Sequence, residues 1–209
     1  VRDGGADPAS NGKLKDLIAK AKANNVPNDN IDRIIKKFSG DNAVNYEEMV
    51  YEGYGPCGVA VIVETMTDNR NRTAGEIRHY FDKYGGNMGA ANCVSWSFDK
   101  KGVIVIDNED EELDEDTVMM DALEAGAADF ESDGDVMTVY TGVDDVATVA
   151  DTLTAAGYKL LSAQVEMLPQ NGYIKLTNED DVKNMQKMLD MFEDNDDVQN
   201  VWHNWEDAE

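Results

Sequence analysis

The spacing of apolar residues changes once along this chain, and that change limits the folds open to it. Two early segments carry apolar residues at the i, i+3, i+4, i+7 spacing of an amphipathic helix. They are Leu14, Leu17, Ile18 and Ala21 in the first segment, and Ile31, Ile34, Ile35 and Phe38 in the second. From Tyr46 onward, β-branched runs such as Val59–Met66 are typical of strands instead. The pattern predicts a helical hairpin, a linker at 40–45, and then a region of mixed strands and helices.

The order of the predicted elements after the linker suggests two related units. The strand 59–66 precedes a helix ending at Gly85-Gly86, and two strands follow, 94–98 and 103–106, joined by a turn at 99–102. A late helix and a final strand at 198–202 would complete a β-α-β-β-α-β set. The elements between about 112 and 168 would then form a second unit inserted into the first.

We therefore predict a multi-domain α+β protein, with an N-terminal helical domain followed by two ferredoxin-like domains, one inserted in the other. The predicted domains are 1–42, 43–111 plus 169–209, and the insertion 112–168. Two short helices bury little apolar area by themselves, so we expect the helical domain to have a further N-terminal part. The lack of an initiator Met agrees with that expectation.

Charge is divided very unevenly between the two halves. Residues 1–101 hold 14 Lys/Arg and 14 Asp/Glu, whereas residues 102–209 hold 4 and 29, so the second half carries the whole net charge of −25. Residues 1–40 have a small excess of positive charge, with 8 basic and 5 acidic residues. Such a protein would meet a nucleic acid with its neutral or basic end. On charge alone, the better explanation of the acidity is that it favours solubility or adaptation to salt.

Several protein classes are disfavoured by the composition. No apolar run approaches the roughly 20 residues of a membrane-spanning helix, and the start has no signal-peptide pattern. Cys57 and Cys93 are too few for a disulfide framework, so we expect free thiols in a reducing, cytoplasmic setting. We expect no membrane partner and no small-molecule substrate.

No catalytic or metal-binding arrangement is recognisable. The glycine-rich stretch Gly53–Gly58 precedes a strand and lacks the Gly-Lys-Ser/Thr of a phosphate loop, so a tight turn is the better interpretation, although its glycines would let a partner approach Tyr54. The acidic run Asp107–Asp116 lacks the glycine and the alternating ligands of a calcium loop, and better suits a helix start. Carboxylates are so numerous that none stands out as an acid or base. We predict no enzyme activity, no cofactor and no metal.

The stretch Thr67–Thr73 is the most informative local feature. It places two arginines and two asparagines at a predicted helix start, where free backbone N–H groups attract phosphate. Helical spacing puts Arg72, Glu76, His79 and Lys83 opposite the apolar stripe, and an ion pair between Arg72 and Glu76 is the alternative role. The candidate nucleic-acid contacts are Lys13, Lys15, Lys20, Lys22, Arg33, Lys36 and Lys37 in the first helices, and Arg70, Arg72, Arg78, His79 and Lys83 in the third.

Long motifs across the chain resemble the YebC/PmpR family. They include Tyr51–Pro56, Val59–Glu64, Thr67–Thr73, Arg78-His79, Gly85–Asn87, Val94–Phe98, Lys101-Gly102, Asp121–Ala127, Pro169–Asn171, Asp197–Val201 and His203-Asn204. The resemblance implies three domains, a helical one and two of α+β type, with no catalytic residues and no metal. Two departures are Cys57, where the family usually has glycine, and Ala90–Asn92, where a Glu-Thr-Gly-like stretch is common.

The resemblance also implies a function. The bacterial family is described as DNA-binding transcriptional regulators, which makes a non-enzymatic, nucleic-acid-binding regulator of gene expression the first expectation. Mitochondrial relatives are translational activators of a cytochrome oxidase subunit, so a ribosome- or rRNA-associated translation factor is the alternative. An enzyme on a ferredoxin-like scaffold is the third possibility, and the fold alone does not support it.

Overall fold

The structure is a computed structural model, and it describes residues 5–23, 26–38, 46–109 and 113–206. The predicted linker at 40–45 lies outside these residues. The chain divides into two compact units, residues 1–47 with 66–70, and residues 48–65 with 71–209. No helix among the described residues is long and apolar enough to cross a membrane.

The first unit contains the two predicted N-terminal helices, α1 (Gly12–Ala23) and α2 (Asn28–Phe38). Asn11 is the N-cap of α1, because its side-chain oxygen accepts the N–H of Leu14 at 3.2 Å. Leu14 and Ile31 are buried, whereas Leu17 and Ile34 are 64% and 52% exposed. The hairpin prediction is confirmed, and among the described apolar side chains of these two helices Leu14 and Ile31 are the buried ones.

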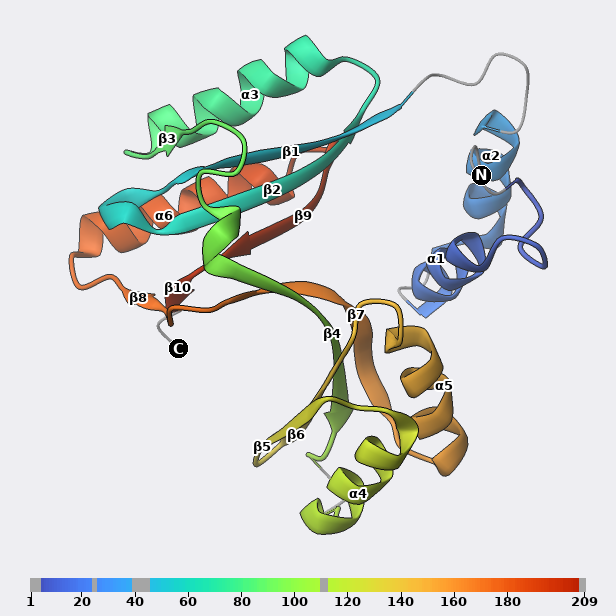
Figure 1. Cartoon of the computed structure of the whole chain (residues 1–209). Helices are drawn as coiled ribbons and strands as arrows, with labels where there is room; N and C mark the ends of the chain where they lie inside the picture. The colour runs from blue at the N-terminus through green and yellow to red at the C-terminus, as the bar shows by residue number, and fades with distance from the viewer. Residues whose placement is uncertain (1–4, 24–25, 39–45, 110–112, 207–209) are drawn as a thin grey trace. The chain divides into compact units, whose positions relative to one another are not determined.

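The second unit has two four-stranded sheets (Figure 1). The first sheet has the order β3-β1-β2-β9, from Asn87–Met88, Glu47–Tyr54, Ala60–Thr67 and Val198–His203. Helices α3 (Arg70–Lys83) and α6 (Glu179–Glu193) pack against this sheet and form a hydrophobic core with it. Val59, Val61 and Val63 pack in one cluster with residues of both helices, including Phe81 and Phe192. The alternation of buried residues therefore directs one face of β2 towards the two helices.

The second sheet has the order β5-β6-β4-β7, with all neighbours antiparallel. Its strands are β4 (Phe98–Asp107), β5 (Asp129–Asp133), β6 (Val136–Thr141) and β7 (Leu160–Pro169). Helices α4 (Glu115–Ala125) and α5 (Val146–Ala156) cover it through a core that includes Ile104, Val118 and Leu153. Its chain order, β4-α4-β5-β6-α5-β7, is a complete ferredoxin-like set.

The two sheets have the same internal arrangement. In the first, α3 carries the chain from β2 past β1 to the edge strand β3; in the second, α4 carries it from β4 past β6 to β5. Strand β1 therefore occupies the position in the first sheet that β6 occupies in the second. In chain order, however, β1 is the first strand of its sheet, whereas β6 is the third of its own. The predicted α+β, multi-domain fold with two ferredoxin-like units is confirmed. A short parallel pair, β8 (Ile174–Lys175) and β10 (Trp205–Glu206), follows the insertion.

The predicted strand pair around Asp99–Gly102 is wrong. Residues 95–97 form a short 3-10 helix, η2, and residues 98–107 form one continuous strand that pairs with β6 and β7, not with the first sheet. The polar stretch before Gly102 resembles a turn, but Gly102 lies opposite Val165 in the middle of the β4–β7 ladder and opposite Thr141 at the end of the β4–β6 ladder. We therefore propose 98–169 as the inserted unit, in place of the predicted 112–168.

Close packing leaves no room for a side chain at Gly102, and the free energy of unfolding of an alanine variant tests this. A Cβ on Gly102 would overlap the Thr141 hydroxyl and lie 2.8 Å from the Val146 Cβ, so Gly102→Ala should lower the free energy of unfolding by about 1–3 kcal/mol. The control is Gly75→Ala in α3, where a Cβ would meet nothing within 4 Å. Because alanine favours helix, the control should raise stability by up to about 1 kcal/mol in urea unfolding. Equal stability of the two variants would contradict this account.

Candidate nucleic-acid interface

Helix α3 is positioned by a buried face and by a polar start. Thr73, Ile77 and Phe81 are completely buried and fix the rotation of the helix against the first sheet. Just before the helix, the Thr67 hydroxyl accepts the N–H of Asn69 at 2.9 Å, which turns the chain out of β2. The opposite side of α3, where the predicted basic residues lie, faces solvent.

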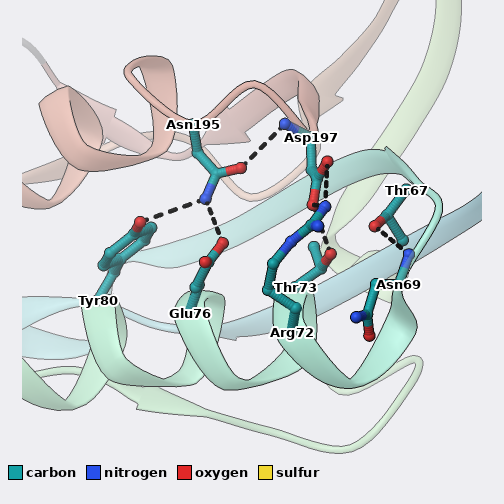
Figure 2. A network of polar contacts seen from close by, with 8 residues as sticks. All are labelled: Thr67, Asn69, Arg72, Thr73, Glu76, Tyr80, Asn195 and Asp197. Carbon is teal, nitrogen blue, oxygen red and sulfur yellow. Dashed lines mark hydrogen bonds and ion pairs between the residues drawn. The ribbon is translucent and has the colours of Figure 1, made fainter.

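Arg72 is held by a carboxylate from the other end of the chain (Figure 2). Its Nη2 lies 3.0 and 2.8 Å from the two carboxylate oxygens of Asp197, in the turn between α6 and β9. The hydroxyl of Thr73 donates to the same carboxylate at 2.7 Å. Asp197 is only 9% exposed, whereas the Arg72 side chain is 44% exposed. The pair is therefore charged, partly buried and doubly hydrogen-bonded, which favours a structural role for Arg72.

The same turn holds the next part of α3. The Asn195 amide donates to a carboxylate oxygen of Glu76 at 2.9 Å and to the Tyr80 hydroxyl at 3.2 Å, and its oxygen accepts the N–H of Asp197 at 2.9 Å (Figure 2). Glu76, the alternative partner predicted for Arg72, thus contacts Asn195, and Arg72 contacts Asp197. A carboxylate already lies at the first turn of α3, where it complements the helix dipole and would compete with an incoming phosphate.

The other predicted cations of α3 are exposed. Arg78, His79 and Lys83 lie on its outer side, and the Lys83 ammonium lies 5.1 Å from the centre of the Tyr84 ring. Arg70 is also exposed and forms a long, 3.6 Å ion pair with Glu47, a type of pair that stabilises little. These side chains have the freedom to contact a polyanion without breaking a buried network.

The basic residues of the first unit are placed on α1 and α2. Lys15, Lys22, Arg33 and Lys36 are exposed. Lys13, Lys20 and Lys37 lie within these helices, but their side chains are outside the described part of the structure. The first unit and α3 therefore present two separate sets of exposed cations.

The glycine-rich stretch Gly53–Gly58 is a turn, as predicted, in which Gly53, Gly55 and Pro56 are buried. It contains the 3-10 turn η1 (Pro56–Gly58) between β1 and β2. Cys57 adopts a φ of 55°, a left-handed conformation that glycine adopts freely, and its thiol donates to Asp181 at 3.1 Å. That hydrogen bond raises the pKa of the Cys57 thiol. Both cysteines are free thiols, as predicted.

A buried carboxylate holds the segment between β3 and β4. Glu52 in β1 is 5% exposed and accepts the backbone N–H groups of Asn92, Val94 and Ser95 at 2.8–2.9 Å. Burial raises the pKa of Glu52, but the backbone hydrogen bonds together lower it by more than burial raises it. The pKa of Glu52 therefore lies below the ordinary 4.5. Glu52 is therefore an ionised structural anchor rather than an acid–base catalyst.

The acidic run before α4 serves the helix start within its described residues. Asp114 is the N-cap of α4 and accepts the N–H of Thr117 at 3.1 Å, while Asp107 accepts a hydrogen bond from Lys159. Residues 110–112 of the run lie outside the described part of the chain. Within the described ranges, no cluster of three or more His, Cys, Asp or Glu side chains has metal-binding geometry.

Two family models cover most of the chain. The TACO1/YebC protein N-terminal domain matches residues 1–41, and the TACO1/YebC second and third domain matches residues 46–205. The chain belongs to the TACO1/YebC family. This confirms the predicted relationship, and the break between the two models coincides with the predicted linker.

Named relatives and a solved structure agree with this membership. Proteins called "Probable transcriptional regulatory protein" from Finegoldia magna and Ruminiclostridium cellulolyticum are 55% and 57% identical to it, over 99% and 100% of this chain and 85% and 84% of theirs. The crystal structure of the conserved hypothetical protein Aq1575 from Aquifex aeolicus matches with a TM-score of 0.84 at 39% identity. That match covers 100% of this chain and 85% of the other. The names of the relatives support a regulatory role for this TACO1/YebC protein.

The partners that organise this region leave no local signal in the sequence. Asp197 lies 125 residues from Arg72, so no local spacing pairs them. Glu52 does have such a signal, because a single charged residue between Tyr51 and Gly53, both buried in the same strand, indicates a buried carboxylate with hydrogen-bond partners. The flanking glycines suggest Tyr54 as a contact, and its hydroxyl donates to the backbone oxygen of Cys93, in the segment that Glu52 holds.

Proposed function

We propose that this TACO1/YebC protein is a non-enzymatic, nucleic-acid-binding regulator of gene expression that acts in the cytoplasm. The observation that carries the proposal is the separation of charge: exposed cations lie on α1, α2 and α3, whereas residues 102–209 hold 4 Lys/Arg against 29 Asp/Glu. A polyanion is attracted to the first set and repelled by the second. The two free thiols agree with a reducing compartment.

Transcriptional regulation through DNA is the first form of this proposal, because the relatives carry that name. Duplex readout would require a helix in the major groove with Arg, Asn or Gln at base edges. The exposed side of α3 offers Asn71 and Arg78 for that purpose. The nucleic-acid contacts that we propose on this helix are Arg70, Arg78, His79 and Lys83. Arg72 is left out because it is bonded to Asp197.

Binding to ribosomal RNA is the second form, and the charge of the body favours it. A net charge of −25 opposes movement along a long duplex but permits one basic end to dock in a crowded RNA–protein site. Binding of the full-length protein to its own promoter fragments and to ribosomes, compared over a salt series, separates the two forms. A steep salt slope without preference among DNA sequences would contradict specific DNA binding. Absence from ribosomal fractions after gentle lysis would contradict the ribosomal form.

The contact on α3 is tested by removing two cations that have no part in the Asp197 network. Arg78→Ala with Lys83→Ala should weaken nucleic-acid binding about tenfold or more, and should reduce the slope of log K against log salt by up to about 2. The matched control is Lys183→Ala with Lys187→Ala, which removes two exposed lysines from α6. Equal losses in the two double variants would show that net charge, not the α3 surface, governs binding.

A further inference from the structure

The segment between β3 and β4 has no regular ladder of its own, yet it is firmly held. The carboxylate of Glu52 accepts three of its N–H groups, and the backbone oxygen of Glu52 accepts the N–H of Gly89 at 2.8 Å. Asn92 adopts a left-handed φ of 64° within this segment. Four bonds to one residue of a central strand fix the path of residues 89–95, so side chains on this segment are presented in a defined position.

Two exposed aromatic side chains converge on this segment. The hydroxyl of Tyr54 and the indole Nε1 of Trp96 both donate to the backbone oxygen of Cys93, at 3.1 and 2.9 Å. Trp96 is 67% exposed and Tyr54 is 38% exposed. The polar atom of each ring is thus satisfied within the protein, and the ring surface is what remains for a partner.

The exposure of Trp96 is not shared by the other tryptophans. Trp205 is 3% exposed, and Trp202 is partly buried with its Nε1 donating to Glu166 at 2.7 Å. Leaving a large aromatic ring in water forgoes about 2 kcal/mol of burial free energy, and nothing in the hydrogen bond to Cys93 requires that exposure. A rigidly held, exposed indole is the arrangement expected of a contact residue.

Charge near the pair indicates the class of partner. The exposed Lys100 follows Trp96 by four residues, and Lys101 follows it by five, at the start of β4. In residues 98–169 the only other basic residue is Lys159, against 19 Asp/Glu. The Lys101 ammonium lies 5.8 Å from the centre of the Tyr140 ring on β6, which leaves the exposed Lys100 as the cation of this acidic unit that follows Trp96 most closely in the chain. Aromatic rings beside cations are the combination that binds single-stranded nucleic acid, by base stacking and phosphate contact.

We propose that Tyr54 and Trp96 form a stacking surface for unpaired nucleobases, with Lys100 contacting the adjoining phosphate. This inference rests on the proposed nucleic-acid function and narrows it to ligands with accessible bases, such as an RNA loop or a single strand. The bases of an intact duplex are stacked on one another, so a duplex would not use this surface. With its polar atoms already bonded, the pair would recognise ring faces and show little sequence preference.

The experiment uses the full chain and three probes of equal length: single-stranded RNA, single-stranded DNA and duplex DNA. Trp96→Ala should weaken binding of both single strands about 5- to 100-fold, the factor that corresponds to loss of one stacked base, and should leave the duplex unaffected. Trp96→Phe keeps a ring but loses the bond to Cys93, so it should retain most of the affinity. The control is Tyr173→Ala, which removes another ring that is 59% exposed, and its affinity should stay within about twofold of the original.

Fluorescence gives a second readout, because Trp96 is the most exposed of the three tryptophans. Single strands should quench the emission of the original protein and shield it from iodide, and both effects should be absent in Trp96→Phe. Unchanged single-strand affinity in Trp96→Ala, or equal losses in the Ala and Phe variants, would overturn the stacking surface. If Trp96→Ala lost binding to a protein partner but kept its affinity for RNA, that result would overturn the stacking surface as well. Failure of the original protein to bind any of the three probes would instead overturn the proposed function itself.

Discussion

Replacing Glu52 by alanine should lower the free energy of unfolding by about 3 kcal/mol, because three backbone N–H groups lose their acceptor at once. The loss is large because the carboxylate is buried and every bond to it is charge-assisted. The N–H groups of the segment at residues 89–97 would then have to bond to water, or the segment would have to change its backbone conformation. Urea unfolding measures the change, and proteolysis of the native protein should show new cleavage within this segment.

Glu52→Gln separates the charge from the shape of the side chain. One carboxylate oxygen accepts from Val94 and Ser95, so the amide oxygen can keep both of those bonds. The amide NH₂ would then face the N–H of Asn92, where two donors meet, and we expect a loss of about 1–2 kcal/mol. Glu48→Gln in the same strand is the control, because Glu48 is exposed, and it should change stability by less than about 0.5 kcal/mol.

The difference between the original protein and Glu52→Gln should depend on pH. The pKa of Glu52 is below 4.5 in the folded protein, so the carboxylate contributes stability that is fully present above about pH 4.5 and is lost as the pH falls through the folded-state pKa. The gap in unfolding free energy should be constant from neutral pH down to about 5 and should narrow by about pH 3. A gap that widens on acidification would show that Glu52 is not held as the ionised form.

Sequence patterns predicted the parts of this fold that depend on local periodicity. The stripe with Ile77 and Phe81 locates α3, and the apolar spacing from Val182 to Phe192 locates α6, because a helix that covers a sheet must repeat its buried residues every three to four positions. The same reasoning did not assign β4 to its sheet. Membership of a sheet is decided by pairing with residues that lie 29 to 71 positions away, and Gly102 resembles a turn residue until Thr141 is seen opposite it.

The candidate interface shows the same division between local and distant causes. Local spacing placed His79 and Lys83 on the exposed side of α3, and both are exposed there, as is Arg78. It also suggested Arg72 as a contact, because a helix start attracts anions, but the anion is supplied by Asp197 from the turn before β9. A motif that looks like a binding site can therefore be a site already filled by the protein's own carboxylate.

Asp197→Ala should destabilise the protein by about 2–4 kcal/mol, the second large effect that we expect. It removes the acceptor of Arg72 and of the Thr73 hydroxyl, and Thr73 is completely buried. Asp196→Ala, which removes the exposed neighbouring carboxylate, is the control and should change stability by less than about 0.5 kcal/mol. Chemical unfolding of the three proteins gives the comparison.

A double-mutant cycle decides whether Arg72 acts through Asp197 or on a ligand. Arg72→Ala should cost about 1–2 kcal/mol alone but add little to Asp197→Ala, with a coupling energy of about 1–2 kcal/mol. In nucleic-acid binding at a temperature where both variants are folded, Arg72→Ala should then have a smaller effect than Arg78→Ala with Lys83→Ala. If the two stability changes simply add, and Arg72→Ala abolishes binding, the arginine is a ligand contact and the phosphate interpretation of the α3 start is correct. The geometry of a shared, nearly buried carboxylate favours the coupled result, because the interaction is lost completely when either partner is removed.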